Sequence, residues 1–137
     1  MRKGLTVGTF DLFHAGHVIM LRDCKKFCDR LVVGIQIDPS VDRPEKNKPI
    51  QSIIERDIQV SSCKHVDAVF IYETEKDLED VLSVIDVNVR FIGKDWYNKQ
   101  ITGGEICKKR GIKIIYTDRD HKWSTTNLRE KIWTEKR

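Results

Sequence analysis

The chain has 137 residues, of which 39% are hydrophobic and 34% charged, and its formal net charge is +4. We predict one domain over residues 1–137, because that length is typical of a domain with its own core. No apolar run approaches the ~18 residues of a membrane span, and Asp11, His14 and His17 interrupt the apolar core that a signal peptide needs. We therefore expect a cytoplasmic protein with no membrane partner.

The 25 basic and 21 acidic residues are well mixed along the chain, which argues against a nucleic-acid partner and is compatible with a small anionic ligand. There are four cysteines, at positions 24, 28, 63 and 107. A zinc site needs about four ligands at suitable spacing, and no second close cysteine pair exists. We expect free thiols and no metal ligand set from the protein.

Apolar runs and helical spacings alternate from one end of the chain to the other. In chain order, we predict a strand over 4–8, a helix over 17–27, a strand over 30–37, a loop over 38–50, a helix over 53–63, a strand over 67–72, a helix over 75–85, a strand over 89–92, a loop over 94–103, a short helix over 104–110, a strand over 112–116, and a last helix from Ser124 or Thr125 to Trp133.

Local sequence supports several of these boundaries. Ser52 with Glu55, and Thr74 with Asp77, have the spacing of a capping box at the start of a helix. Gly111 is suited to end the short helix, and all three prolines fall within the loop over 38–50.

Alternating strands and helices predict an α/β fold: a Rossmann-like, doubly wound, parallel five-stranded sheet with helices on both faces. Ligands of such sheets bind beyond the carboxyl ends of the strands. The segments 8–17, 38–48, 93–96 and 118–126 should therefore meet at that edge.

The segment from Gly8 to His17 runs from the first strand, through a turn, to the start of a helix. Free backbone N–H groups and the positive end of the helix dipole favour a polyphosphate there. His14 and His17 are three residues apart and share one helix face, so both imidazoles can donate hydrogen bonds to phosphate oxygens. A pair of core histidines or a metal-binding pair is the alternative interpretation.

This segment resembles the signature of the cytidylyltransferase-like nucleotidyltransferases, whose histidine motif reads His-x-Gly-His. The resemblance covers nearly the whole chain. It is closest to the small glycerol-3-phosphate cytidylyltransferases, and more distant to the heptose-phosphate, phosphocholine, phosphoethanolamine and flavin nucleotidyltransferases.

Three later segments are similar to motifs of the same family. Gly93-Lys94-Asp95-Trp96 resembles its Gly-x-Asp-Trp/Tyr segment, and Arg119 followed by Trp123-Ser124-Thr125-Thr126 resembles its motif near the carboxyl end. In that motif Trp123 replaces the usual Ile. Lys46 and Lys48 resemble phosphate-binding lysines of the family. From the residues alone, the two lysines can equally be solvated loop charges, and Ser124 and Thr125 can be simple helix caps.

The resemblance implies roles for individual residues. It implies catalytic roles for His14, His17 and Lys46, and acceptor contacts for Asp11, Lys48 and Lys64, the last standing where the glycerol-3-phosphate enzymes carry an arginine. Contacts to the nucleotide are implied for Gly8, Thr9, Phe10, Asp11, Gly16, Asp95, Trp96, Arg119, Trp123, Ser124, Thr125 and Thr126.

We accordingly expect transfer of CMP from CTP to glycerol 3-phosphate or a similar phospho-alcohol, with release of pyrophosphate. Mg²⁺ is the expected cofactor, because it screens the triphosphate charge, and the family implies a homodimer. Residues 97–111 resemble instead the heptose-phosphate adenylyltransferases. An adenylyltransferase that uses ATP with a sugar phosphate or FMN is therefore one alternative, and a catalytically silent nucleotide-binding module is another.

Overall fold

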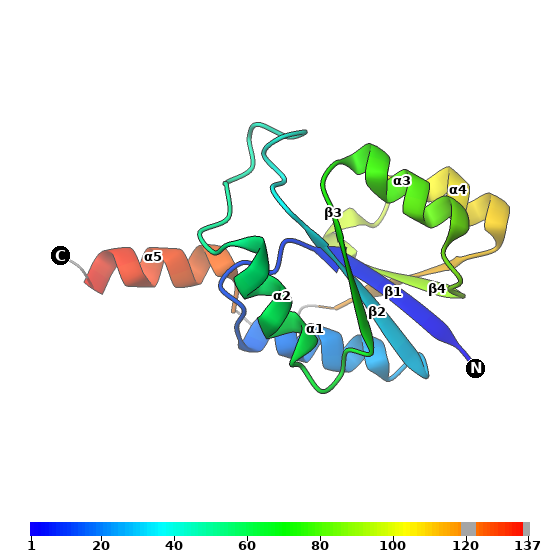
Figure 1. Ribbon diagram of the computed structural model, residues 1–137, viewed down its shortest axis with the longest axis horizontal. Helices are drawn as coiled ribbons and strands as arrows, with labels where there is room; N and C mark the ends of the chain where they lie inside the picture. Colours follow the sequence, from blue (N-terminus) through cyan, green and yellow to red (C-terminus); the bar gives the residue numbers. More distant parts are fainter. Residues whose placement is uncertain (119–122, 136–137) are drawn as a thin grey trace.

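The computed structural model describes residues 1–118 and 123–135, which form one parallel sheet between two layers of helices (Figure 1). The strands are β1 (Lys3–Gly8), β2 (Arg30–Gln36), β3 (Ala68–Tyr72), β4 (Val89–Gly93) and β5 (Lys113–Thr117). The helices are α1 (Ala15–Lys25), α2 (Ile53–Ser61), α3 (Glu75–Val84), α4 (Gly104–Arg110) and α5 (Thr125–Glu135), with a one-turn 3₁₀ helix, η1 (Lys94–Trp96), after β4.

The strand order is β3-β2-β1-β4-β5, and every neighbouring pair is parallel. The chain starts in the centre of the sheet, winds outward through β2 and β3, and crosses back to β4 and β5. The direction reverses beside β1, which places the topological switch point at the carboxyl end of that strand. The predicted Rossmann-like α/β fold with five parallel strands is confirmed.

Two hydrophobic clusters lie on opposite faces of the sheet. On one face, Leu21 of α1 and Val60 of α2 pack against strand residues that include Val33. On the other face, Leu82 of α3 and Cys107 of α4 pack around Leu5. Helices α1 and α2 therefore cover one face and α3 and α4 the other (Figure 1). Within the described part of the chain, no helix is long and apolar enough to span a membrane.

Both predicted capping boxes are present, since Ser52 pairs with Glu55 and Thr74 with Asp77. The first helix, however, begins at Ala15 rather than at His17, because His14 itself serves as its N-cap. The structure differs in one further element: the segment predicted as a loop over 94–103 contains η1. The four cysteines are free.

Candidate active site

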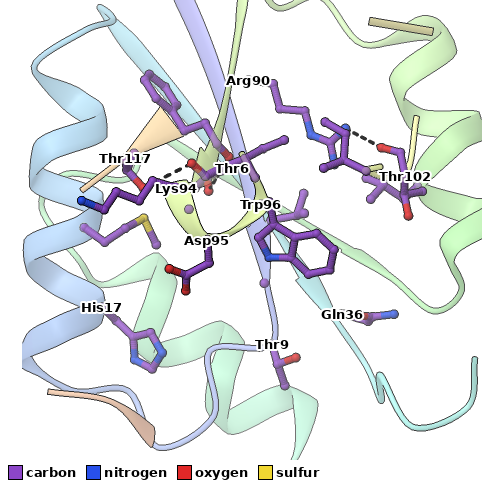
Figure 2. A pocket seen from close by; sticks show the side chains of 18 of the residues that line it. Thr6, Thr9, His17, Gln36, Arg90, Lys94, Asp95, Trp96, Thr102 and Thr117 are labelled. Atoms are coloured by element: carbon purple, nitrogen blue, oxygen red, sulfur yellow. Dashed lines mark hydrogen bonds between the residues drawn. The ribbon is translucent and has the colours of Figure 1, made fainter. Parts of the chain in front are cut away.

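A cavity of about 530 Å³ lies at the carboxyl edge of the sheet (Figure 2). It reaches both faces of the sheet, because its lining includes His17 of α1 on one face and Leu78 of α3 on the other. Seven of the residues singled out from the sequence line it: Gly8, Thr9, His14, Gly16, His17, Asp95 and Trp96.

The two histidines cap helix α1 in a reciprocal way. The backbone N–H of Gly16 donates to Nδ1 of His14 (3.0 Å), and the backbone N–H of His14 donates to Nδ1 of His17 (3.2 Å). A nitrogen that accepts such a bond carries no proton, so the proton of each neutral ring is on Nε2. The cap thereby fixes both imidazoles as Nε2 donors at a positively polarised helix end, an arrangement suited to phosphate oxygens.

Helix α5 joins this motif through Thr125. The hydroxyl of Thr125 donates to the backbone carbonyl of Asp11 (3.1 Å) and lies 3.3 Å from Nε2 of His14. Since that hydroxyl donates its only proton to the Asp11 carbonyl, it acts as an acceptor toward Nε2 of His14. This agrees with the tautomer that the cap sets. Ser124 caps the same helix by accepting from the N–H of Asn127 (3.0 Å).

The Asp11 carboxylate is buried and fully engaged within the protein. It accepts from the backbone N–H groups of Ile50 (2.8 Å) and Gln51 (2.9 Å) and pairs with the guanidinium of Arg129 (2.6 Å). Burial alone would raise the pKa of Asp11, but these hydrogen bonds and the charge of Arg129 outweigh burial and hold the pKa below its usual range. Asp11 thus ties the histidine turn to the loop before α2 and to α5.

The buried side chain of Arg56 also holds the histidine turn. It is 2% exposed, and its guanidinium donates to the carbonyls of Thr9 (3.1 Å), Gln36 (2.6 Å) and Ile37 (2.7 Å). The carboxyl ends of β1 and β2 are thereby fixed relative to each other. The turn itself needs support, because Phe10 and Leu12 have positive φ angles of 54° and 52°. Phe10 is buried and lies against His17, with ring centroids 5.4 Å apart.

Polar side chains that sequence reasoning missed line the part of the cavity under α3 and α4. Arg43, from the loop after β2, contacts Gln36 (3.3 Å) and forms an ion pair with Glu75 (3.3 Å). Arg90 of β4 donates to the carbonyl of Thr102 (2.5 Å). The only sequence clue to Gln36 and Glu75 was their position at or just after the carboxyl ends of β2 and β3.

Other residues with predicted roles lie outside the cavity lining. Lys46 and Lys48 are exposed on the loop after β2, and Phe10 is part of the core. Lys64 is exposed between α2 and β3, at the amino-terminal edge of the sheet, so the fold does not bring it to the cavity. Trp123 and Thr126 are exposed beside the start of α5, and Arg119 lies outside the described residues.

A family model described as cytidylyltransferase-like matches residues 5–131. The chain belongs to the cytidylyltransferase-like family. It is 36% identical over 132 residues to the bifunctional protein HldE of Rhodopseudomonas palustris (strain HaA2), a match that covers 96% of this chain and 27% of that protein. It is 35% identical to HldE of Paramagnetospirillum magneticum, a match that again covers 96% of this chain and 27% of that protein. The chain thus spans about a quarter of the length of these curated relatives.

Two solved structures share the fold of this chain. The crystal structure of the lipopolysaccharide core biosynthesis protein from Thermoplasma volcanium superposes with a TM-score of 0.67 at 25% identity, covering 90% of this chain and 99% of that one. Pantoate-beta-alanine ligase from Francisella tularensis superposes with a TM-score of 0.59 at 18% identity over 93% of this chain and 65% of its own. The second similarity shows the fold alone.

Proposed function

We propose that this member of the cytidylyltransferase-like family transfers a nucleotidyl group from a nucleoside triphosphate to a phosphorylated small molecule. The observation that carries the proposal is the pair of imidazoles at the start of α1, both fixed as Nε2 donors and both lining the cavity. Two such donors beside a helix amino terminus suit the charge that develops on phosphate oxygens during phosphoryl transfer.

The proposed step is a direct displacement. An oxygen of the acceptor phosphate attacks the α-phosphorus of the nucleotide, and the bond from that phosphorus to the oxygen bridging it to the β-phosphate breaks. Pyrophosphate leaves with the bonding electrons. A phosphate monoester is already anionic near neutral pH, so the protein has to align the reactants and stabilise charge rather than supply a nucleophile. His17 donates its Nε2–H to the transferring phosphate. The Nε2–H of His14, which the Thr125 hydroxyl accepts, turns to a phosphate oxygen or is shared with it.

Mg²⁺ would be bound mainly through the triphosphate. Among the described residues, no group of three or more His, Cys, Asp or Glu side chains forms a metal site. Mg²⁺ commonly binds through one or two carboxylates together with substrate phosphates, and Asp95 in the cavity lining fits that requirement. When bound, the ion screens the negative charge of the triphosphate.

CTP and a phospho-alcohol such as glycerol 3-phosphate are the first candidate pair. A second candidate pair is ATP with a sugar phosphate. The polar side chains of Gln36, Arg43 and Glu75 in the cavity lining suit an acceptor with several hydroxyl groups. The description of the Thermoplasma volcanium neighbour as a lipopolysaccharide core biosynthesis protein also supports a sugar acceptor.

A pyrophosphate-release screen tests the proposal. Each of CTP, ATP, GTP and UTP is combined with phosphorylated alcohols, sugars, amino alcohols and FMN, with Mg²⁺ present. Release that requires both a nucleotide and an acceptor is the expected result, and release with ATP alone among the four identifies the second candidate. Tight nucleotide binding without pyrophosphate release for any acceptor would refute the transferase proposal and support a silent binding module.

A further inference from the structure

A buried arginine in the cavity has no acidic partner among the described residues. Arg90 is 4% exposed, and it contacts the carbonyl of Thr102 (2.5 Å) and, more weakly, the sulfur of Cys107 (3.9 Å). Among residues 1–118 and 123–135, no carboxylate lies within 4.0 Å of its guanidinium. One carbonyl does not neutralise a buried charge, and an apolar residue of similar volume would fit a central strand at lower cost.

The register of the sheet fixes where Arg90 stands. Arg90 pairs with Leu5 of β1, and Leu5 packs in the cluster beneath α3 and α4. Arg90 therefore lies on the α3/α4 face, opposite the face covered by α1 with its His17. Figure 2 shows His17 and Arg90 at opposite ends of the cavity, with Asp95 and Trp96 between them.

A second arginine in the same cavity is incompletely satisfied. Nε of Arg43 is buried and has no hydrogen-bond partner among the described residues, while Nη2 contacts Gln36 and Glu75 at 3.3 Å each. Arg43 and Arg90 both act on the hydroxyl of Tyr72: burial and Glu75 raise the pKa of Tyr72, and the two arginines oppose that rise. The lining of this part of the cavity thus has two guanidinium groups and one carboxylate, that of Glu75. A second carboxylate, that of Asp42, is occupied by the backbone N–H of Glu75 (2.6 Å).

We infer that the α3/α4 side of the cavity binds a second anionic group of the acceptor, distinct from the phosphate that attacks the nucleotide. Arg90 and Nε of Arg43 provide the donors for it. The acceptor class is therefore a phosphorylated polyhydroxy compound that carries a carboxylate or a second phosphate at its far end. This inference rests on the proposed function, since it assigns the attacking phosphate to the histidine end of the cavity.

Three matched probes test the inference by calorimetric binding to the full chain without nucleotide. Glucitol 6-phosphate has a neutral far end, 6-phosphogluconate has a carboxylate there, and glucitol 1,6-bisphosphate has a second phosphate. We expect the wild-type protein to bind at least one of the two anionic probes tenfold or more tightly than glucitol 6-phosphate. Which anionic probe binds better distinguishes a carboxylate from a phosphate.

Substitution of Arg90 then locates the preference. Arg90→Met should abolish it and leave binding of glucitol 6-phosphate unchanged, whereas Arg90→Lys should retain part of it. Arg110→Met is the matched control. Arg110 also donates to backbone carbonyls, those of Leu82 (2.7 Å) and Ile85 (2.8 Å), but it does not line the cavity. If Arg90→Met does not fold, Arg43→Met gives the same test through the second arginine.

Three results would overturn the inference. The first is a wild-type protein that binds neither anionic probe more tightly than glucitol 6-phosphate, and the second is a preference for an anionic probe that survives in Arg90→Met. The third is an equal loss of affinity for all three probes in that variant. The last would show that Arg90 only supports the Thr102 loop. Because binding is measured without nucleotide, the result does not depend on turnover. Failure of the pyrophosphate screen would refute the proposed reaction, but it would not change a binding preference for the anionic probes that had been measured without nucleotide.

Discussion

His14 combines two tasks in one side chain, and the two ring nitrogens divide them. Nδ1 accepts from the backbone of α1, and Nε2 is the donor that lies near Thr125. A substitution that removes the whole ring therefore removes a helix cap together with a donor. The two effects can be separated, because asparagine is a good N-cap residue but has no group at the position of Nε2.

We predict that His14→Asn keeps the thermal stability of the wild type and lowers kcat by two or more orders of magnitude, the scale expected when one transition-state donor is lost. His14→Ala and His17→Ala should lower kcat similarly and also cost about 1 kcal/mol of stability through the lost cap. Steady-state kinetics and thermal unfolding measure both effects. His65→Ala, in the loop between α2 and β3, is the control; near-full activity in either histidine variant of the motif would refute its phosphate role.

Asp11 contributes to stability in a pH-dependent way. Its pKa in the folded protein is lowered from the ordinary value of an aspartate. Its contribution is therefore present above that ordinary value, about 3.9, and is lost as the pH falls through the lower folded-state pKa. We predict that Asp11→Asn reduces the free energy of unfolding by about 1–3 kcal/mol at pH 6, because partners of a buried carboxylate are left unsatisfied. The difference from wild type should shrink below pH 4.

Chemical denaturation at pH 6 and pH 3 measures that difference. Asp67→Asn is a useful control. Asp67 likewise pairs with a basic side chain, that of Lys25, and accepts from the backbone N–H of Leu31, but it lies far from the cavity. The control should lose stability and keep activity, whereas Asp11→Asn should lose both. A stability difference that does not change with pH would show that the Asp11 charge has no part in holding the turn.

Among the connecting elements, the loop after β2 is anchored at both ends and exposed in the middle. Arg43 is held by Gln36 and Glu75, and at the far end the carbonyl of Lys48 accepts from Arg129 (3.3 Å). Lys46 lies between these anchors, on the exposed stretch. The proposed phosphate contact therefore falls on an exposed part of the loop, where the backbone N–H of Lys46 donates to the carbonyl of Arg43 (2.9 Å).

We predict that Lys46→Ala lowers kcat/KM by on the order of 10–1000-fold, if the ammonium contacts charge that develops in the transition state. Lys48→Ala should have a smaller effect, because its backbone is tied to α5. Steady-state kinetics of both variants, with Lys64→Ala as a control on the opposite edge of the sheet, decides the matter. Wild-type kcat/KM in both loop variants would show that the lysines are ordinary solvated charges.

Two glycines at the ends of the connection from β4 to α4 have opposite requirements. Gly103 has φ +75°, and a Cβ there would come within 2.3 Å of Cδ1 of Leu82. Gly93 has no atom within 4 Å of a Cβ and φ −59°. We predict that Gly103→Ala destabilises the protein by about 1–3 kcal/mol through strain and overpacking and that Gly93→Ala leaves stability within about 0.5 kcal/mol of wild type. Denaturant titration compares the two; equal stabilities would contradict the close approach of Gly103 to Leu82 of α3.

The elements themselves could be predicted where a local rule applies. Ser52 with Glu55, and Thr74 with Asp77, follow the commonest capping pattern, so those helix starts were predicted correctly. The start of α1 was missed because histidine is not among the usual N-cap residues. The single turn of η1 was missed because three residues give no periodic pattern.

Of the residues in the site, only those at strand ends or in recognisable motifs could be predicted from the sequence. The parallel-sheet rule brought Thr9, His17 and Asp95 to one edge, and all three line the cavity. Arg56 and Arg90 could not be predicted, because each acts through carbonyls that are distant in the sequence, and an arginine within a helix or strand pattern is typical of an exposed charge.

At the scale of the whole molecule, helix α2 leaves an apolar stripe uncovered. Of the apolar residues there, Ile53 and Val60 pack in the core, but Ile54 and Ile58 are 69% and 62% exposed, and Ile50 just before the helix is 62% exposed. Ile54 and Ile58 are four apart within α2, so they share one face of that helix. We propose this stripe as the homodimer contact that the family resemblance implies.

We predict a dimer at micromolar concentration by analytical sedimentation, and a monomer after Ile54→Glu with Ile58→Glu, because charges in an apolar contact disfavour association. Val84→Glu, on an exposed position of α3 (78%), is the control and should remain dimeric. A wild-type monomer at that concentration would refute the homodimer. A dimer that persists in the double variant would show that the dimer contact lies on another surface.

The bond between His14 and Thr125 joins residues that are 111 positions apart in the chain, and Arg129 reaches Asp11 across 118. During translation, the histidine turn therefore leaves the ribosome long before its partners have been made. At about 5–20 residues per second, roughly 5–20 s pass between the synthesis of the motif and that of α5. Strands β2 to β4 are all made in that interval, and β5 follows only shortly before α5. The contacts of the histidine turn with Thr125 and Arg129 are therefore among the last that the growing chain can form.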